Sequence, residues 1–156
     1  MPIAEFDAAL GNTERVFLDR STLLAFHSPP ELTHPLAKHL LDRIADDQDP
    51  VRGYFSAVSA SEVLVRPLRA GVQEYNFMHD VLTRFPNLTI LPVDLSVALQ
   101  AATLRAATSI RLPDALIVAS GLLASCEVIV SNDAQWRRRL APLFPNFRWL
   151  QLGDYV

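Results

Sequence analysis

Runs of mostly apolar residues, each about the length of a strand, recur along this chain of 156 residues. The run Val128–Val130 is wholly apolar, which is typical of a parallel strand that is covered on both faces. The run Val16–Leu18 is wholly apolar as well, while the other three runs are mixed but contain β-branched and aromatic residues. We therefore predict five strands, at Val16–Leu18, Tyr54–Val58, Leu88–Val93, Val128–Val130 and Phe147–Gln151.

Stretches of helical periodicity separate these runs. Leu36, Leu40 and Ile44 recur four residues apart after Pro35, so they predict a helix with one buried face that stops at the acidic stretch 46–49. Further helices are predicted to begin near Ser21, Ser59, Val72, Asp94, Leu112 and Asp133. Strands that alternate with helices predict an α/β fold, a five-stranded parallel sheet flanked by helices on both faces.

Local signals set some of the helix boundaries. The segment Ser59–Glu62 has the form of a capping box, in which the serine and the glutamate would begin a helix together. Pro67 should break or bend that helix, and Gly71 marks the next boundary. In the stretch 72–85, the apolar residues at helical spacing predict a packing surface, made by Tyr75, Met78, Leu82 and Phe85.

Length and composition predict one domain over residues 1–156, with residues 1–14 as a polar N-terminal lead. Half of the residues are apolar, which is enough for one compact core. The longest apolar run, Ala115–Cys126, is too short to span a bilayer, and the N-terminus lacks the pattern of a signal peptide. We expect a protein that does not enter the membrane.

The net charge of −3 argues against a protein that binds nucleic acid through basic residues alone. A nucleic-acid partner would need a local basic patch or bound metal ions. The positive charge is nearly all arginine, with Lys38 as the only lysine. Cys126 is the only cysteine, and its apolar neighbours predict a buried thiol in a reducing compartment, the cytoplasm.

Acidic residues stand where strands end or helices begin. Asp19 directly follows the first strand, Glu62 and Asp133 follow the second and fourth, and Asp114 follows Pro113 at a helix start. Each acid has a purely local explanation, because a carboxylate is favourable in the first turn of a helix. Parallel strands, however, present their carboxyl ends at one edge of the sheet, where ligands bind. The four acids together predict an oxygen-rich pocket.

Carboxylates without histidine or cysteine partners are the ligands that hard cations prefer, so the expected metal is Mg²⁺ or Mn²⁺. His34 and His39 stand five residues apart and face different ways, while His27 and His79 stand alone. The chain has no glycine-rich phosphate loop, and it lacks the second acid of an aspartate-nucleophile phosphatase after Asp19. A metal–carboxylate site remains the sharpest hypothesis.

The segments around the acids resemble, in order, the acidic motifs of the PIN-domain ribonucleases, and most closely those of the VapC toxins of bacterial toxin–antitoxin pairs. The resemblance covers Val16 to Leu152. It rests on Val16-Phe17-Leu18-Asp19-Arg20-Ser21, Ser59-Ala60-Ser61-Glu62-Val63-Leu64-Val65, Leu112-Pro113-Asp114-Ala115-Leu116, Val130-Ser131-Asn132-Asp133 and the stretch Arg66–Gly71.

This resemblance implies RNA cleavage dependent on Mg²⁺ or Mn²⁺, a homodimer, and control by a cognate antitoxin protein. It also implies roles for particular residues. The catalytic and metal-binding acids would be Asp19, Glu62, Asp114 and Asp133. Ser131 would replace the usual threonine of the fourth motif, and Ser21 and Asn132 would support the site.

Arginines near the acids are candidates for contact with RNA. Arg20 stands where the family commonly has a small residue, and it could contact a substrate phosphate or compete with the metal. Arg137 and Arg138 belong to the triplet 137–139 in the helix after Asp133 and could line an RNA groove, although such a triplet is often just a solvated helix face.

Two other hypotheses stay open at the level of sequence. The chain could be a catalytically silent PIN-like module that binds RNA or protein, with Arg20 spoiling the metal site. It could also be a receiver-like domain that binds Mg²⁺ through Asp19 for phosphoryl acceptance. The second is weaker, because the acid after the third strand, Asp94, is better explained as a helix cap.

Overall fold

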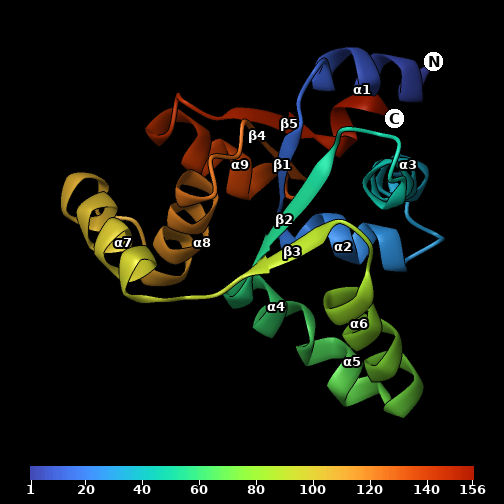
Figure 1. Ribbon diagram of the computed structural model, residues 1–156, viewed down its shortest axis with the longest axis horizontal. Coiled ribbons are helices and arrows are strands. Elements are labelled where there is room, and N and C mark those ends of the chain that lie inside the picture. The colour runs from blue at the N-terminus through green and yellow to red at the C-terminus, as the bar shows by residue number, and fades with distance from the viewer.

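A five-stranded parallel sheet forms the centre of the protein, which a computed structural model describes over residues 1–156 (Figure 1). The strand order is β3-β2-β1-β4-β5, and every neighbouring pair is parallel. The strands are β1 (Arg15–Leu18), β2 (Arg52–Ser56), β3 (Leu88–Leu91), β4 (Val128–Ser131) and β5 (Arg148–Gln151). The predicted α/β fold with five parallel strands is confirmed.

Helices cover both faces of the sheet and join its strands (Figure 1). The α-helices are α1 (Pro2–Leu10), α2 (Arg20–His27), α3 (His34–Ala45), α4 (Ala57–Val63), α5 (Val65–Ala70), α6 (Val72–Arg84), α7 (Leu95–Thr108), α8 (Leu112–Leu123) and α9 (Ala134–Leu140). Two short 3₁₀ helices follow, η1 (Ala141–Leu143) and η2 (Leu152–Tyr155).

The sheet separates two hydrophobic cores, because successive side chains of a strand point to opposite faces. In β1, Val16 and Leu18 pack among the residues of α1 to α4 and α6, while Phe17 packs among those of α7 to α9. The helix α8 approaches β1 closely at Gly121, where an added Cβ would lie 3.1 Å from the ring of Phe17. This close contact fixes α8 against the centre of the sheet.

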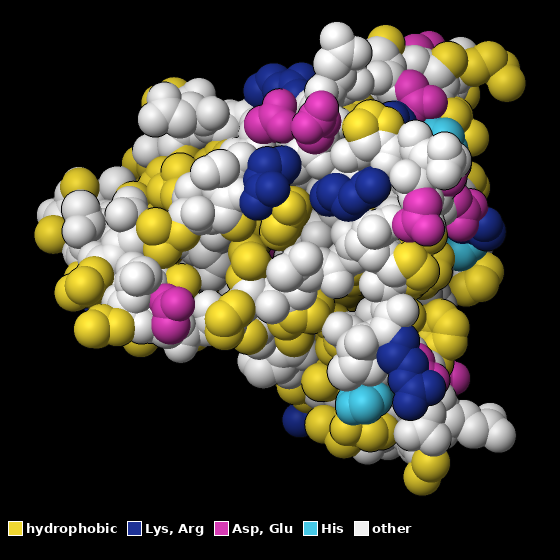
Figure 2. Space-filling model, viewed as in Figure 1, with side chains coloured by type: hydrophobic (Ala, Val, Ile, Leu, Met, Phe, Trp, Pro, Cys, Tyr) yellow, Lys and Arg dark blue, Asp and Glu magenta, His cyan; other side chains and the backbone are white.

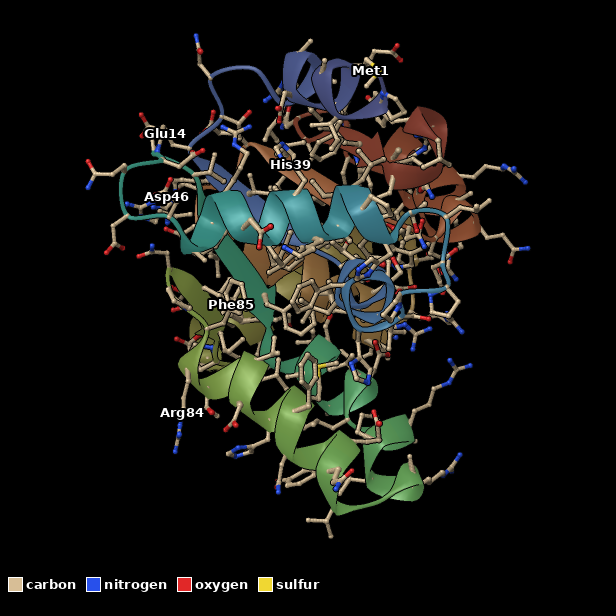
Figure 3. All side chains as sticks on the ribbon, turned by 90° about the vertical axis from the view of Figure 1, so that its right-hand side faces the viewer. Met1, Glu14, His39, Asp46, Arg84 and Phe85 are labelled. Carbon is tan, nitrogen blue, oxygen red and sulfur yellow. The ribbon has the colours of Figure 1, made fainter.

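The first residues of the chain form a packed helix rather than the polar lead that we predicted. Phe6 and Leu10 of α1 are fully buried. Phe6 also meets the ring of Tyr155 edge to face at 5.6 Å, so α1 packs on the end of the chain. Figure 3 shows α3 lying below α1, and the ring of His39 binds the carboxylate of Asp7 at 2.9 Å.

Residues 52–70 also differ from the prediction at their boundaries. The strand β2 ends at Ser56, and α4 begins directly after it because the Ser56 side chain accepts a hydrogen bond from the N–H of Val58 at 3.1 Å. Ser59 therefore caps nothing, and the predicted capping box is wrong. The helix breaks at Leu64, and Pro67 lies inside α5 rather than at the break.

Several other sequence predictions about boundaries and burial are confirmed. Gly71 separates α5 from α6 with φ at 134°, a conformation that favours glycine. Asp94 caps α7 by accepting from the N–H of Val97 at 3.0 Å. Met78 and Leu82 are buried in α6, although Val81 is buried as well and the prediction omitted it. Cys126 is buried, and burial raises the pKa of its thiol to about 12.

Replacing Ser56 by alanine should destabilise the protein by about 1 kcal/mol, because α4 would lose its cap. Ser59→Ala is the matched control. Ser59 is equally buried, but its hydroxyl has no hydrogen-bond partner, so removing it should cost little or increase stability. Urea unfolding of both variants tests this. If Ser59→Ala lowered the free energy of unfolding more than Ser56→Ala, the predicted capping box at Ser59 would be correct after all.

No single helix of the protein has the length and apolar composition needed to cross a membrane; only α7 and α8 taken together, bent by 119° at their junction, meet those criteria. The surface over α7 carries many hydrophobic side chains, which are seen at the left of Figure 2. They include Leu95 and Leu99, which are 72% and 61% exposed.

Candidate functional site

The strand order of the sheet reverses between β1 and β4. The strands β2 and β3 lie on one side of β1, while β4 and β5 lie on the other. In open parallel sheets, ligands bind beyond the carboxyl ends of the strands at such a switch point. Asp19 follows β1 and Asp133 follows β4, and the N–H of Asp19 donates to the carbonyl of Val130 at 3.0 Å. The sheet therefore brings these two acids to one edge.

All four acids predicted from the sequence line one cavity at this edge, with a volume of about 410 Å³. Asp19 and Asp133 come from the strand ends. Glu62 is brought by the last turn of α4, and Asp114 by the first turn of α8. The convergence that sequence patterns left open is thus present, although the catalytic and metal-binding roles of these residues remain predictions.

Asp19 is the most enclosed of the four acids. Its side chain is held on one oxygen, Oδ2, which accepts from the Ser21 hydroxyl at 2.7 Å and the Ser131 hydroxyl at 3.2 Å. The residue is 4% exposed and forms no ion pair with an arginine or lysine. Burial raises the pKa of Asp19, and the hydrogen bonds from Ser21 and Ser131 only partly oppose this effect.

Ser21 and Ser131 tie the loops after β1 and β4 together. The hydroxyl of Ser21 accepts from the N–H of Asn132 at 2.7 Å, and that of Ser131 accepts from the N–H of Asp133 at 3.0 Å. Asn132 supports this link through its backbone only, because its side chain turns away and donates to Glu31 at 3.1 Å. The two serines thus join the loops that carry Asp19 and Asp133, and their role as supporting residues stays a prediction.

Asp114 is buried and already has partners. Its Oδ1 accepts from the indole Nε1 of Trp136 at 3.0 Å, and its Oδ2 lies 3.0 Å from Nη2 of Arg139 and 3.7 Å from Nε of Arg111. Trp136 in turn donates its backbone N–H to Asp133, which caps α9. Asp114 and Asp133 are therefore connected through Trp136, in the first turn of α9.

Glu62 lies nearer the solvent and is paired with Arg20, whose Nη1 is 3.7 Å from Oε2 of the glutamate. Partial burial raises the pKa of Glu62; the charge of Arg20 lowers it, and the nearby charges of Asp19 and Asp114 raise it further. The mutual influence of these carboxylates shows that they share one electrostatic environment.

A sequence profile of the PIN domain family matches residues 16–140, which is most of the chain. The chain belongs to the PIN domain family.

Solved structures with the same fold agree with this assignment. A toxin–antitoxin complex from Klebsiella pneumoniae has 18% identity and a TM-score of 0.62, and the match covers 85% of this chain and 94% of that one. The toxin VapC20 of Mycobacterium tuberculosis, described as cleaving the sarcin–ricin loop, has 16% identity and a TM-score of 0.61, with 80% and 95% covered.

The VapBC2 complex of Rickettsia felis, solved with a DNA fragment from its promoter, has 13% identity and a TM-score of 0.64, with 88% and 98% covered. At these identities, the likeness establishes the fold. A search of curated protein sequences found no match.

The side chains that line the cavity of this PIN domain suit a hard divalent cation by chemistry. They offer four carboxylates and the amide oxygen of Gln135, and no histidine or cysteine. In their present positions, however, no three acidic, histidine or cysteine side chains lie close enough to hold one ion. Like-charged carboxylates repel one another, and arginines pair with Glu62 and Asp114. The donor set fits, and a cation would have to compete with these arginines.

Structure and prediction differ over the arginines of this PIN domain. Arg139 reaches the cavity, whereas Arg137 pairs with Asp154 and Arg138 lines none of the larger cavities. Arg20 does line the cavity, as expected. Arg111 also lines it and was missed, although its place three residues before Asp114 at a helix start was a usable signal.

Proposed function

We propose that this PIN domain is an endoribonuclease that depends on Mg²⁺ or Mn²⁺ and hydrolyses phosphodiester bonds of RNA. The observation that carries the proposal is the convergence of Asp19, Glu62, Asp114 and Asp133 on one cavity at the switch point of the sheet. Local roles such as the capping of α9 by Asp133 do not require four carboxylates from four segments to meet, and a bound cation would relieve their mutual repulsion.

In this proposal the four acids have different roles, according to how firmly each side chain is held. Asp19, fixed by Ser21 and Ser131, and Asp114, fixed by Trp136, are the rigid ligands. Glu62 and Asp133 complete the donor set. When bound there, a divalent cation would lower the pKa of a water molecule and stabilise negative charge on the phosphate.

The arginines that line the cavity have a second task once substrate arrives. Arg20 is about half exposed, and its contact with Glu62 at 3.7 Å is loose. A guanidinium so placed can leave the glutamate and donate two hydrogen bonds to a phosphate of the RNA, which is the geometry that arginine favours. Arg20 would thereby position substrate rather than spoil the site.

The biological role we propose is that of the toxin in a VapBC-type toxin–antitoxin pair, acting on RNA in the cytoplasm. Support comes from the similar structures, whose descriptions name toxins and toxin–antitoxin complexes. The partners in this proposal are a cognate antitoxin protein and a second copy of the chain. The exposed Leu95 and Leu99 of α7 offer an apolar surface for such an interface.

Incubation of the purified protein with RNA tests the proposed chemistry. Cleavage should appear with Mg²⁺ or Mn²⁺ and stop with EDTA, because the carboxylates act only through the cation. A protein carrying both Asp19→Asn and Asp133→Asn, purified identically, reports contaminating nuclease. Equal cleavage by this double variant and the wild type, or no cleavage of any RNA by the wild type, would reject the proposal.

One observation favours the alternative, a catalytically silent module. Arginines pair with two of the acids, and no three ligands are gathered for a metal. Such a module would bind RNA or protein without cutting RNA, and its Tm would not respond to Mg²⁺. The thermal response to metal therefore distinguishes the alternatives before any substrate is known.

A further inference from the structure

A second cavity, of about 490 Å³, adjoins the acid-lined cavity. The two share Arg20, Glu62 and Asp133 in their linings, so they meet at these residues, and we call the two together the groove. The second cavity extends along α5, where Arg66 and Arg69 line it. A ligand that lies in the groove would therefore meet the acids in its middle part and α5 beyond them.

Arg66 and Arg69 are unusual among the arginines of this protein. Both residues are exposed, and neither guanidinium group donates a hydrogen bond or forms an ion pair within the protein. Arg138 is the only other arginine of which this is true, and it lines neither cavity of the groove. In a chain with a net charge of −3, two unpaired guanidinium groups one helical turn apart beside an acid-lined cavity favour an anionic ligand.

The groove also restricts what form that anion takes. Asp19 and Asp114 are 4% and 6% exposed, so a reacting phosphate must enter the cavity to reach them. An unpaired strand can bend its backbone inward, whereas the two strands of a duplex are held at a fixed separation. No aromatic ring lines the second cavity, and Trp136 of the first is buried with its Nε1 bonded to Asp114. Contacts to phosphate, rather than base stacking, remain to hold a strand.

We propose that Arg66 and Arg69 hold the phosphates of an unpaired RNA strand on one side of the acid-lined cavity. The inference rests on the proposed ribonuclease function and adds the form of the substrate and its path. The strand is held by contacts between charge and phosphate, because the groove offers no aromatic ring on which bases could stack. The affinity should therefore fall steeply with salt. Arg111 and Arg139 line the acid-lined cavity and not the second one.

The test measures binding and not cleavage. Anisotropy of a short fluorescent single-stranded RNA is titrated in the Asp19→Asn background, where the strand is not cut, at several salt concentrations. The double variant Arg66→Gln, Arg69→Gln should bind about tenfold more weakly. Its slope of log K against log salt should fall by about 1.4, because each phosphate of a single strand that an arginine no longer neutralises lowers the slope by about 0.7.

The matched control is Arg84→Gln. It removes the same kind of charge from α6, and Figure 3 shows the Arg84 side chain directed away from the body of the protein. Its affinity and salt slope should equal those of the parent. Arg66 and Arg69 have no partners within the protein, so their replacement should leave the Tm unchanged, and a weaker Kd then reports the missing guanidinium groups. A fully paired hairpin RNA of equal length should bind more weakly than the single strand.

Unchanged binding by the double variant, an equal loss for Arg84→Gln, or equal binding of the hairpin would each overturn the inference. The first of these results would assign the second cavity to a protein partner instead. The outcome is separable from that of the proposed function. If the wild type cleaves RNA and the double variant binds RNA normally, only this inference is rejected. If the protein binds RNA through Arg66 and Arg69 but cleaves none, only the proposed nuclease function is rejected.

Discussion

Asp19→Asn is expected to raise the Tm of the metal-free protein while lowering RNA cleavage by more than about 100-fold. The pKa of Asp19 is raised by burial, so the stability it contributes is complete below its ordinary pKa and is lost as the pH rises through the raised value. At high pH, ionisation of this buried carboxyl therefore destabilises the wild type. Asparagine removes that charge, and its amide oxygen can still accept hydrogen bonds from Ser21 and Ser131.

Thermal scans at pH 8 in EDTA and in Mg²⁺ measure both effects. Each kcal/mol gained should raise the Tm by about 2–4 °C in a protein of this size. Mg²⁺ should raise the Tm of the wild type but not that of the variant, because the ion loses a rigid ligand. Asp80→Asn, an exposed acid on α6, is the control for a change in net charge. If the Asp19→Asn protein melts at a lower temperature than the wild type in EDTA, the unfavourable burial of Asp19 is contradicted. If its Tm still responds fully to Mg²⁺, Asp19 as a metal ligand is contradicted.

Arg139→Gln should have the opposite effect on stability. Asp114 is buried, and its Oδ2 would lose a guanidinium at 3.0 Å, which leaves Arg111 at 3.7 Å as its remaining cationic partner. The metal-free variant should lose about 1 kcal/mol, since the arginine itself is half exposed and water screens the pair. The carboxylate freed in this way is available to a cation. We expect half-maximal stabilisation at about tenfold lower Mg²⁺ than in the wild type.

Arg138→Gln is the matched control for this experiment, because it removes the neighbouring arginine of the same helix. It has no partner, so neither the Tm in EDTA nor the Mg²⁺ midpoint should move. Titration of the Tm with Mg²⁺ gives both quantities for both proteins. Identical midpoints for Arg139→Gln and the wild type would mean that this arginine does not compete for the site.

Much of the fold was predictable because local chemistry and tertiary structure agree in most segments. The apolar run Val128–Val130 forms β4, and Asp94 caps α7 as its position suggested. The prediction placed Ser56 inside the second strand and took Ser59 as the start of the next helix, whereas Ser56 caps that helix in the structure. Both fit the local rules for a cap, and the end of β2, which decides between them, is set by pairing with β1 and β3.

The N-terminal helix was missed for a different reason. Pro2, Phe6 and Leu10 have helical spacing, and Gly11 follows as a stop signal, so the pattern was present in the sequence. Its charged residues, such as Glu5, made the segment look solvated. What makes it a packed helix is the burial of Phe6 against Tyr155, a residue at the other end of the chain that no local rule could connect with it.

The acids of the site were found from sequence, but the pairing of their side chains was not. Helical phase shows why Arg139 and not Arg137 or Arg138 reaches the cavity. Trp136 is buried toward Asp114, and a residue three positions further along α9 lies on the same face. The arginine triplet was therefore resolvable in principle, once Trp136 was recognised as the inward residue.

The position of β1 at the centre of the sheet has a consequence for the synthesis of the protein. β1 is the first strand to be made, yet it pairs on one side with β4, which begins only at Val128. Asp19 is held by Ser131 from that late strand, and Asp133 lies beyond it. A nascent chain thus carries Asp19 without Ser131 and Asp133 until nearly all of the protein has left the ribosome. The acid-lined cavity therefore cannot assemble before translation of this chain is almost finished.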